Sequence, residues 1–596
     1  MCGVAGFYGL NAQKAQALLN ALAHRGPDDS GVFEGDLITL VHRRLSVQDI
    51  ALGRQPMQRG DLTIVFNGEI YNHIALRKSV EADFKTRSDT ETLLALYQDR
   101  GANALDIIDG MFAFAIYNKR DKTLFLARDR YGKKPLYYSF QNGFMFASEI
   151  NALTKVANFA VDRDAAAAYF GFGFIPFDRS IYKEIIKLNA GSWLKLRLDT
   201  FEIESGRFFS PFDLGAETIT DENEAIEQIE SALSQSVKSR LESSDVEVGS
   251  FLSGGIDSSL VSFYAAKERP NLQTFTVRFA GNYDESPQAE ATAKAIGSAH
   301  MTIDVAPNMK EDIESILARY GEPFSDSSAI PSFYVAKAAR ERVKVVLNGD
   351  GADELFAGYR RYVPIANGWF SWARRFSFLA KILPKPAKKI SAYNYLYRLI
   401  ESAGAKTPLE FWLKTRPAIS LPISADNLVA KEVALFLENL PNSTPLSLAL
   451  LSDQALLLFG DLLPKMDIAT MAVALEARSP FLSRDLSYLA PRIDDRLKIR
   501  GAKTKYILRR LALKRLGKNV ANAPKRGFEV PLANWAQNDL KEPIEDLVLS
   551  PNAFWRDFLD KDVLNAPFGR EGRAKALWTL FCFEIWNKNR QKPLFS

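Results

Sequence analysis

Short apolar and alternating runs, separated by turn residues, dominate the first third of the chain. They predict strands at Leu62–Phe66, Met111–Tyr117 and Thr123–Arg128. The spacing of apolar residues predicts helices near residues 12–23 and at Leu93–Tyr97. Strands with helical segments on both sides indicate a layered α+β domain.

A mixed stretch that contains Gly and Pro, Ser205–Thr220, separates this part from the rest. We expect one domain at residues 1–205 and another at 206–596, because a chain of 596 residues is too long for one compact core. The amphipathic run Glu222–Leu241 predicts a long helix at the start of the second domain.

Two apolar runs follow, Val246–Leu252 and Val343–Leu347, and each leads into a Gly-rich polar loop and a helical segment. A further strand is predicted at Thr274–Phe279 and a further helix at Glu290–Ile296. This repetition predicts a parallel, doubly wound sheet. The last third of the chain has helical patterns, so the predicted fold class is α+β followed by α/β with a largely helical C-terminal part.

The first loop has the sequence S-G-G-I-D-S-S at 253–259. Its two glycines allow backbone N–H groups to converge, and the helix that follows, with Ser258 near its cap, adds positive potential. These features predict a phosphate-binding loop; an ordinary Gly-Gly turn is the alternative. It is not a Walker A loop, because no Gly-Lys-Ser/Thr follows at the required spacing. Asp257 beside phosphates would suit a bound Mg²⁺.

The second loop begins N-G-D-G-A-D-E at 348–354. Because the carboxyl ends of parallel strands meet at one edge of a sheet, Asp257 and Asp353 are predicted to share one metal ion. A calcium loop or a solvated turn is the alternative for such an acidic, Gly-rich string.

Composition narrows the class of protein. The apolar fraction of 47% and the charged fraction of 25% are those of an ordinary globular protein, and a net charge of +5 does not predict nucleic-acid binding. No run of 18 apolar residues and no basic-then-apolar N-terminal segment is present, so we expect neither a membrane span nor secretion. Cys2 and Cys582 are the only cysteines, which favours a cytoplasmic enzyme without disulfides.

Cys2 directly follows the initiator methionine. Removal of that methionine would give Cys2 a thiol, with an ordinary pKa of about 8.5, and a free α-amino group, with an ordinary pKa of about 7.7–8.0. A neutral amine can take the thiol proton, as in N-terminal-nucleophile catalysis. A cysteine that occupies position 2 by chance is the alternative.

Five strings follow Cys2 in an order that resembles the class II glutamine amidotransferase domain, and the resemblance covers the first third of the chain. They are H-R-G-P-D at 24–28, R-L-S at 44–46, N-G-E-I-Y-N at 67–72, S-D-T-E at 88–91 and R-D-R-Y-G-K-K-P-L-Y-Y at 128–138. The resemblance implies an αββα fold of the N-terminal-nucleophile (Ntn) hydrolase type, in which Cys2 attacks the amide of glutamine.

The same resemblance implies roles for the residues around Cys2. The Asn67 side chain and the Gly68 backbone N–H would form the oxyanion hole. Arg44 would bind the α-carboxylate of glutamine, and Asp89 and Glu69 its α-ammonium group. Taken singly, Asn67-Gly68 could be a hairpin turn, and Arg44 and Asp89 surface ions. The implied glutamine site is Arg44, Asn67, Gly68, Glu69 and Asp89.

Strings in the second domain resemble the synthetase domain of glutamine-hydrolysing asparagine synthetase, an ATP pyrophosphatase with a PP-loop. Besides the two Gly-rich loops, they are L-P-K-M-D-I-A-T-M-A at 463–472, L-E-A-R-S-P-F-L at 475–482 and P-K-R-G-F-E-V-P at 524–531. The resemblance then extends over nearly the whole chain in the order of that family.

This second resemblance implies that Asp257 and Asp353 hold Mg²⁺. Lys465 would neutralise phosphate and later the tetrahedral intermediate, with a solvated helix residue as the alternative. The best-known bacterial branch has Glu where this chain has Asp350, and that Glu is tied to the adenylated acceptor; the shorter side chain would reshape the acceptor pocket. The implied ATP contacts are Leu252, Ser253, Gly254, Gly255, Asp257, Ser258, Val277, Asn348 and Gly349.

The implied reaction is hydrolysis of glutamine at Cys2, internal passage of ammonia, and amidation of a carboxylate that ATP has activated as an acyl-adenylate. Aspartate is the expected acceptor; a sugar, a peptide or a secondary-metabolite precursor is the alternative. A non-catalytic glutamine sensor is the hypothesis from another class. The expected partners are glutamine, ATP and aspartate, with a homodimer as a possible assembly and without nucleic acid or membrane.

Overall fold

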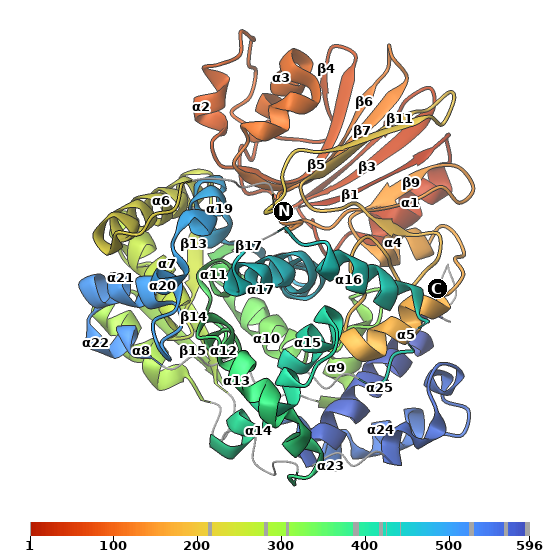
Figure 1. The fold of residues 1–596 in the computed structure, drawn as a ribbon. Coiled ribbons are helices and arrows are strands. Elements are labelled where there is room, and N and C mark those ends of the chain that lie inside the picture. Colours follow the sequence, from red (N-terminus) through yellow and green to blue (C-terminus); the bar gives the residue numbers. More distant parts are fainter. Residues whose placement is uncertain are drawn as a thin grey trace.

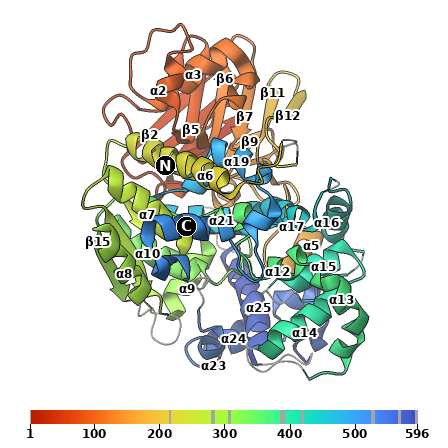
Figure 2. The ribbon, with the colours of Figure 1, turned by 60° about the vertical axis from the view of Figure 1, so that its left-hand side comes forward.

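The computed structural model describes residues 2–212, 217–278, 284–304, 309–384, 392–416, 421–424, 426–441, 443–523, 530–565 and 570–590. Figure 1 shows a β-rich N-terminal domain above a larger α/β and helical body, and Figure 2 shows the same arrangement from another side.

The N-terminal domain has four layers. Its two antiparallel sheets pack face to face, and side chains from both fill the space between them. α3 (Asp89–Arg100) covers the outer face of one sheet and α1 (Ala12–Ala21) that of the other, which confirms the predicted αββα arrangement. The first sheet has the order β10 (Ile186–Lys187), β8 (Tyr137–Ser139), β9 (Met145–Ala147), β1 (Gly3–Tyr8), β3 (Ile38–Arg44), β2 (Asp29–Glu34). The second has the order β12 (Ile203–Arg207), β11 (Ser192–Arg197), β7 (Thr123–Arg128), β6 (Gly110–Asn118), β5 (Leu62–Ile70), β4 (Met57–Arg59).

β5 is longer than the sequence predicts, because it continues through Asn67 and Gly68 to Ile70. A hairpin turn at Asn67-Gly68 is therefore excluded. Gly68 lies opposite Phe112 of β6, and a Cβ atom at Gly68 would lie 2.1 Å from the carbonyl oxygen of Met111. Only glycine allows the two strands to approach this closely.

The second domain is built on a five-stranded parallel sheet, as predicted. α6 (Glu222–Glu242), α7 (Ile256–Glu268) and α21 (Tyr506–Leu516) pack on one face, and α10 (Ala329–Arg340) and α18 (Leu463–Met471) on the other. The chain moves outward from β13 in both directions, so the loops after β13 and β16 lie at the switch point of the sheet. The order is β15 (Ala299–Asp304), β14 (Gln273–Arg278), β13 (Val248–Phe251), β16 (Val345–Leu347), β17 (Glu476–Arg478).

β17 is a strand that the sequence analysis did not identify within the C-terminal part, which was predicted to be largely helical. This edge strand has only three residues, and two of them are charged. Glu476 and Arg478 are fully buried, and Arg478 Nε lies 2.6 Å from Glu476 Oε1. A buried ion pair thus stands where the sequence pattern of a strand would have apolar side chains.

The remaining C-terminal part is mostly helical, as predicted. One continuous helical run consists of α17 (Pro445–Asp453), a π-helical stretch at Gln454–Leu462, and α18. This run, Pro445–Met471, is long and apolar enough to cross a membrane by length and composition, yet 67% of its most apolar window is buried inside the protein. It is the core helix of the second domain.

The two domains share one hydrophobic core. α5 (Arg163–Phe172) packs against α25 (Arg570–Arg590) in the largest buried cluster. The Tyr169 hydroxyl donates a hydrogen bond to the carbonyl oxygen of Thr579 at 2.9 Å. Cys2, which directly precedes β1, and the parallel sheet are therefore held in a fixed relation.

Candidate active sites

Cys2 lies immediately before β1, where the N-terminal domain meets the parallel sheet. Its backbone nitrogen donates to Asn67 Oδ1 at 3.0 Å, and Arg25 Nε donates to its carbonyl oxygen at 3.1 Å. Burial raises the pKa of the Cys2 thiol, which the backbone of Leu45 and the charge of Arg44 partly offset. Formation of the thiolate therefore requires a base, and the α-amino group of Cys2 is the nearest candidate in the sequence.

Asn67 is fully buried and has an open donor. Its Oδ1 is engaged by Cys2, while no residue of the described chain accepts a hydrogen bond from its Nδ2. A buried donor without a partner costs about 1–3 kcal/mol, so this amide is suited to a ligand that restores the hydrogen bond. A donor next to a nucleophile is the requirement of an oxyanion hole.

Two buried carboxylates stand near the same strand. Asp89 Oδ2 accepts a hydrogen bond from the Ile70 N–H at 2.8 Å, and burial raises the pKa of Asp89 to about 6. Burial and the nearby Glu476 raise the pKa of Glu69 well above its ordinary value. Glu69 Oε1 lies 3.5 Å from Arg478 Nη2, and its Oε2 has no hydrogen-bond partner among the described residues. A bound cation, such as the ammonium of an amino acid, would favour the ionised form of both carboxyl groups and so lower their pKa values.

Arg44 ends β3 beside this site. Its guanidinium donates to three backbone carbonyls, those of Gln48, Asp49 and Ile50, at 2.8–3.1 Å. Arg44 therefore orders the loop that borders the site. Binding of a glutamine α-carboxylate by this residue stays a prediction.

The raised pKa of Asp89 leads to a pH-dependence. We expect the KM for glutamine to rise as the pH falls through about 6, since protonated Asp89 no longer attracts an ammonium group, and to level off above that pH. Glutaminase kinetics between pH about 5 and about 8 would measure this. Asp89→Asn should have a KM about tenfold higher that no longer responds to pH in this range.

Asp99→Asn is the matched control, because Asp99 is an exposed carboxylate near the other end of α3. It should behave as the wild type. A wild-type KM that stays constant across this pH range would show that Asp89 does not contact the substrate ammonium.

The loop after β13 has the geometry of an anion site. Gly254 has a φ of +74°, and a Cβ there would lie 2.6 Å from Gln288 Cγ. α7 begins at Ile256 with Gly255 as its N-cap and without a side-chain cap, so its first N–H groups remain open for an anion. The predicted serine near the cap does not cap the helix: the Ser258 hydroxyl donates instead to the Gly255 carbonyl oxygen at 3.3 Å.

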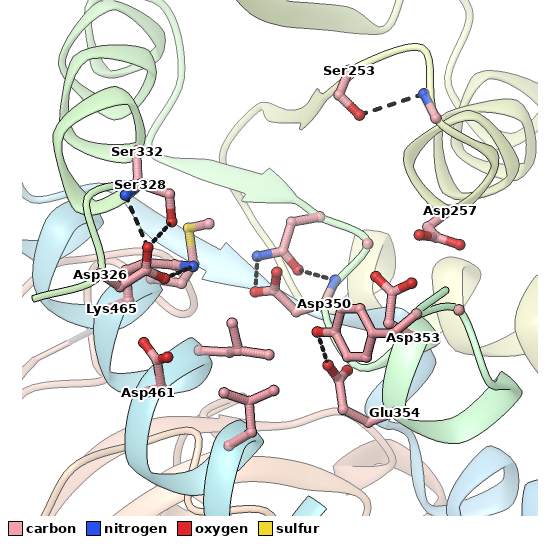
Figure 3. A pocket seen from close by; sticks show the side chains of 18 of the residues that line it. Ser253, Asp257, Asp326, Ser328, Ser332, Asp350, Asp353, Glu354, Asp461 and Lys465 are labelled. Carbon is pink, nitrogen blue, oxygen red and sulfur yellow. Dashed lines mark hydrogen bonds and ion pairs between the residues drawn. The ribbon is translucent and has the colours of Figure 1, made fainter. Parts of the chain in front are cut away.

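The two Gly-rich loops touch. A Cβ at Gly349 would lie 2.8 Å from Asp257 Cβ, and Figure 3 shows Asp257 and Asp353 side by side. The Lys505 ammonium lies between them, 2.5 Å from Asp257 Oδ2 and 2.7 Å from Asp353 Oδ1. The predicted convergence of the two loops is therefore present, with a lysine that the sequence analysis did not single out.

The same carboxylates fit Mg²⁺. Asp257 Oδ1 is buried and lacks a hydrogen-bond partner within the described residues, so an oxygen ligand is available. The described residues contain no group of three or more His, Cys, Asp and Glu side chains placed to hold a metal. Mg²⁺ in nucleotide sites is commonly bound by one or two carboxylates together with the substrate phosphates, and two carboxylates meet that requirement.

A cavity of about 520 Å³ opens at this edge of the sheet. Most of the predicted ATP contacts line it, namely Leu252, Ser253, Gly255, Asp257, Ser258, Asn348 and Gly349. Gly254 and Val277 do not line it. Val277 lies in the buried cluster with Phe251, while β14 contributes Phe275 and Thr276 to the lining. Of the string at 524–531, residues 524–529 lie outside the described residues.

Asp350 lies in the middle of the cavity (Figure 3). Its Oδ2 accepts a hydrogen bond from Asn348 Nδ2 at 2.6 Å, and Asn348 Oδ1 accepts one from the Ser479 hydroxyl at 2.6 Å. Ser479 in turn accepts a hydrogen bond from Lys133, a residue of the N-terminal domain whose pKa burial lowers to about 8. This chain of contacts fixes the orientation of Asp350.

Lys465 lines the opposite side of the cavity. Its Nζ lies 2.8 Å from Asp326 Oδ2; burial opposes the charge of Lys465, but Asp326 and Asp461 raise its pKa above the ordinary value. Burial and Asp326 raise the pKa of Asp461 to about 7, and Arg416 Nη2 lies 3.7 Å from Asp461 Oδ2. Lys465 is thus held in the cavity wall, and a solvated position is excluded.

The sequence analysis missed Asp326, Asp461, Arg416 and Lys505. A signal existed for Asp326, since S-D-S-S at 325–328 precedes a helix in the same way as the phosphate loop. Asp461 lies four residues before Lys465 in the same helical run, so its spacing from Lys465 was also a signal. No local pattern marks Arg416 and Lys505, because each lies at the end of a helix that is distant in the sequence.

The comparisons with known proteins agree with this geometry. Residues 228–588 match the family model described as asparagine synthase, and residues 1–208 match that of the glutamine amidotransferase domain. The chain is 33% identical to the glutamine-hydrolyzing asparagine synthetase 1 of Bacillus subtilis (strain 168), over 98% of this chain and 96% of that protein. The chain belongs to the asparagine synthase family.

Two other matches cover less of the chain. The glutamine-hydrolyzing asparagine synthetase B of Escherichia coli (strain K12) is 33% identical over 60% of this chain and 65% of that protein. A solved structure of the allosteric regulatory enzyme of purine biosynthesis is 15% identical with a TM-score of 0.29, and it covers 52% of this chain and 81% of that chain. Membership of the asparagine synthase family makes the protein an enzyme of glutamine-dependent, ATP-driven amidation.

In this member of the asparagine synthase family, α18 connects the two sites. Lys465 lines the cavity at the edge of the parallel sheet, whereas Asp467, two residues later, pairs with Arg25 Nη2 at 2.9 Å and with Lys134 Nζ at 3.0 Å. Arg25 also holds the Cys2 carbonyl oxygen and pairs with Glu149 at 2.8 Å. One turn of one helix therefore contacts both the surroundings of Cys2 and the cavity at the edge of the parallel sheet.

Proposed function

We propose that this protein synthesises asparagine from aspartate, with glutamine as the nitrogen donor and ATP as the activating substrate. Glutamate, AMP and pyrophosphate are the other products. The observation that carries the proposal is the meeting of Asp257, Asp353 and Lys505 at the phosphate loop, in the same cavity as Lys465 and Asp350.

The first half-reaction belongs to Cys2. Its Sγ attacks the side-chain carbonyl carbon of glutamine, and the α-amino group takes the thiol proton and passes it to the leaving nitrogen, which departs as ammonia. Asn67 Nδ2 and the Gly68 N–H stabilise the oxyanion. Water then hydrolyses the thioester to glutamate and regenerates Cys2.

The second half-reaction belongs to the cavity. The open N–H groups of α7 and the Lys505 ammonium hold the triphosphate. Asp257 and Asp353 would hold Mg²⁺, which would supply positive charge to neutralise the pyrophosphate that leaves. The acceptor carboxylate attacks the α-phosphorus, and ammonia then attacks the acyl carbon and displaces AMP. Lys465 stabilises the charge on the tetrahedral intermediate.

The charges around α18 support aspartate as the acceptor. Lys465 and Arg416 supply cations, and Asp350 and Asp461 supply carboxylates, so the cavity can match an ammonium and two carboxylates at once. A sugar acid lacks the ammonium group. Amidation of another carboxylate remains the second candidate, because Asp350 is shorter than the Glu expected at its position.

Release of pyrophosphate with ATP, glutamine and one acceptor at a time tests the proposal. We expect release with aspartate, and Asp350→Asn should raise the KM for aspartate about ten- to a hundredfold while the KM values for ATP and glutamine change little. Release with a sugar acid or peptide and none with aspartate would favour the second candidate. An absence of release with any carboxylate would favour the glutamine sensor.

A further inference from the structure

The stretch between Glu354 and Glu401 has an unusual composition. It carries nine lysine or arginine residues and no aspartate or glutamate, and it is rich in tryptophan, phenylalanine and tyrosine. The net charge of the whole chain is only +5. Positive charge is therefore concentrated in one segment of the chain, where it can act on a partner.

The described part of this stretch forms a small helical unit. α13 (Trp369–Ala373), a 3₁₀ helix η2 (Arg374–Lys381) and α14 (Ala392–Ala403) pack on one another. Their inner side is a core of Ala373, Leu399, Ala403 and Phe370. The unit thus already has a buried side, and the large apolar residues that face outward are not needed for its packing.

We define the α13–η2 surface by the exposed side chains Trp369, Trp372, Arg374, Arg375, Phe376, Phe378, Lys381 and Ile382. Trp372, Phe378 and Ile382 are 55%, 58% and 73% exposed, although their burial elsewhere would be strongly favourable. The rings of Trp372 and Phe376 lie 5.1 Å apart. Adjacent exposed aromatic residues of this kind mark an interaction site.

The cations on this surface have no acidic partner in the part of the chain that the structure describes. Within the described residues, Arg374, Arg375 and Lys381 form no ion pair, and no acidic residue is near them in the sequence. α13 and α14 lie at the end of the body farthest from α2 and α3 of the N-terminal domain (Figures 1 and 2). The surface can therefore meet a large partner without covering the glutaminase domain.

We propose that the α13–η2 surface docks on an anionic lipid bilayer. Tryptophan, phenylalanine and isoleucine side chains fit the boundary between headgroups and acyl chains, while neighbouring Arg and Lys meet anionic headgroups. A second copy of the chain is a poorer occupant, since a twofold contact would place the cations of the surface against themselves. The composition and net charge of the whole chain do not predict such a membrane partner.

Co-sedimentation of the full chain with phosphatidylcholine vesicles, with and without phosphatidylglycerol, tests this. We expect binding only to the vesicles with phosphatidylglycerol, and weaker binding at high salt. Trp372→Ser with Phe378→Ser, and separately Arg374→Glu with Arg375→Glu, should each lower the partition coefficient at least about tenfold. Wild-type rates of pyrophosphate release would show that both variants are folded.

Matched controls come from exposed residues elsewhere. Leu10→Ser with Leu435→Ser removes two leucines that are each 61% exposed, and Lys119→Glu with Arg120→Glu reverses two exposed cations of the N-terminal domain. Both should bind vesicles as the wild type does.

Three results would overturn the proposal. The first is equal binding to both kinds of vesicle, and the second is unchanged binding of the surface variants. The third is a wild type that does not bind vesicles but binds a single-stranded oligonucleotide or forms a dimer, when the surface variants do neither.

Discussion

Replacement of Cys2 by alanine is expected to abolish glutamine-dependent product while synthesis from ammonium ions continues. Cys2 contacts Asn67 through its backbone nitrogen, and the other cysteine of the chain, Cys582, lies in the hydrophobic core near the C-terminus. Loss of a nucleophile that acts with a base and an oxyanion hole typically costs at least about a thousandfold in rate. Ammonia needs no thiol to attack an activated acyl group.

Product formation with each nitrogen donor would be measured on the same preparation. Cys582→Ala is the matched control, since it removes a buried thiol without touching the glutamine site. It should keep both activities. A Cys2→Ala variant that hydrolyses glutamine at the wild-type rate would show that the nucleophile lies elsewhere.

Asp257→Asn is expected to stop pyrophosphate release with both nitrogen donors, while glutaminase activity persists. The Lys505 ammonium bridges Asp257 and Asp353 in this structure. Asp257→Asn therefore removes one of the two negative charges that neutralise this ammonium and any bound metal ion. Charge-assisted contacts contribute about 1.5–3 kcal/mol each, and at least two are altered, which gives a loss of about a hundredfold or more.

Adenylation precedes amination, and for that reason the choice of nitrogen donor should not matter. Asp304→Asn is the matched control, because Asp304 ends β15 of the same sheet with its side chain 79% exposed. It should behave as the wild type. Normal adenylation by Asp257→Asn would refute a metal-binding role for this residue.

The elements that depend on local pattern were predictable. The strand Thr123–Arg128 agrees with its prediction residue for residue, and α6 differs from the predicted helix by one residue at its end. The phosphate loop could also be predicted, because its backbone conformation requires glycine and serine at fixed spacings.

The parts that depend on tertiary packing were not predictable. Glu476 and Arg478 form a strand although their side chains are charged, since each neutralises the other inside the protein. Lys505 sits before α21 with a φ of +50°, and nothing adjacent in the sequence indicates that it reaches the loops 150–250 residues earlier. Ion pairs between residues that are far apart in the sequence produce no periodic pattern from which they could be predicted.

The pairing of Arg25 with Asp467 limits how the two domains could be exchanged between relatives. Both side chains are at most 1% exposed, and breaking a buried pair on one side typically costs about 3–5 kcal/mol. In a chimera that joins a foreign amidotransferase domain to residue 209, Asp467 would stay buried. It would then face the residue that the foreign domain has in place of Arg25. Recombination is therefore expected to succeed only when both partners of Asp467, Arg25 and Lys134, are inherited with it, so these ion pairs, more than the linker, set the unit that can be transplanted.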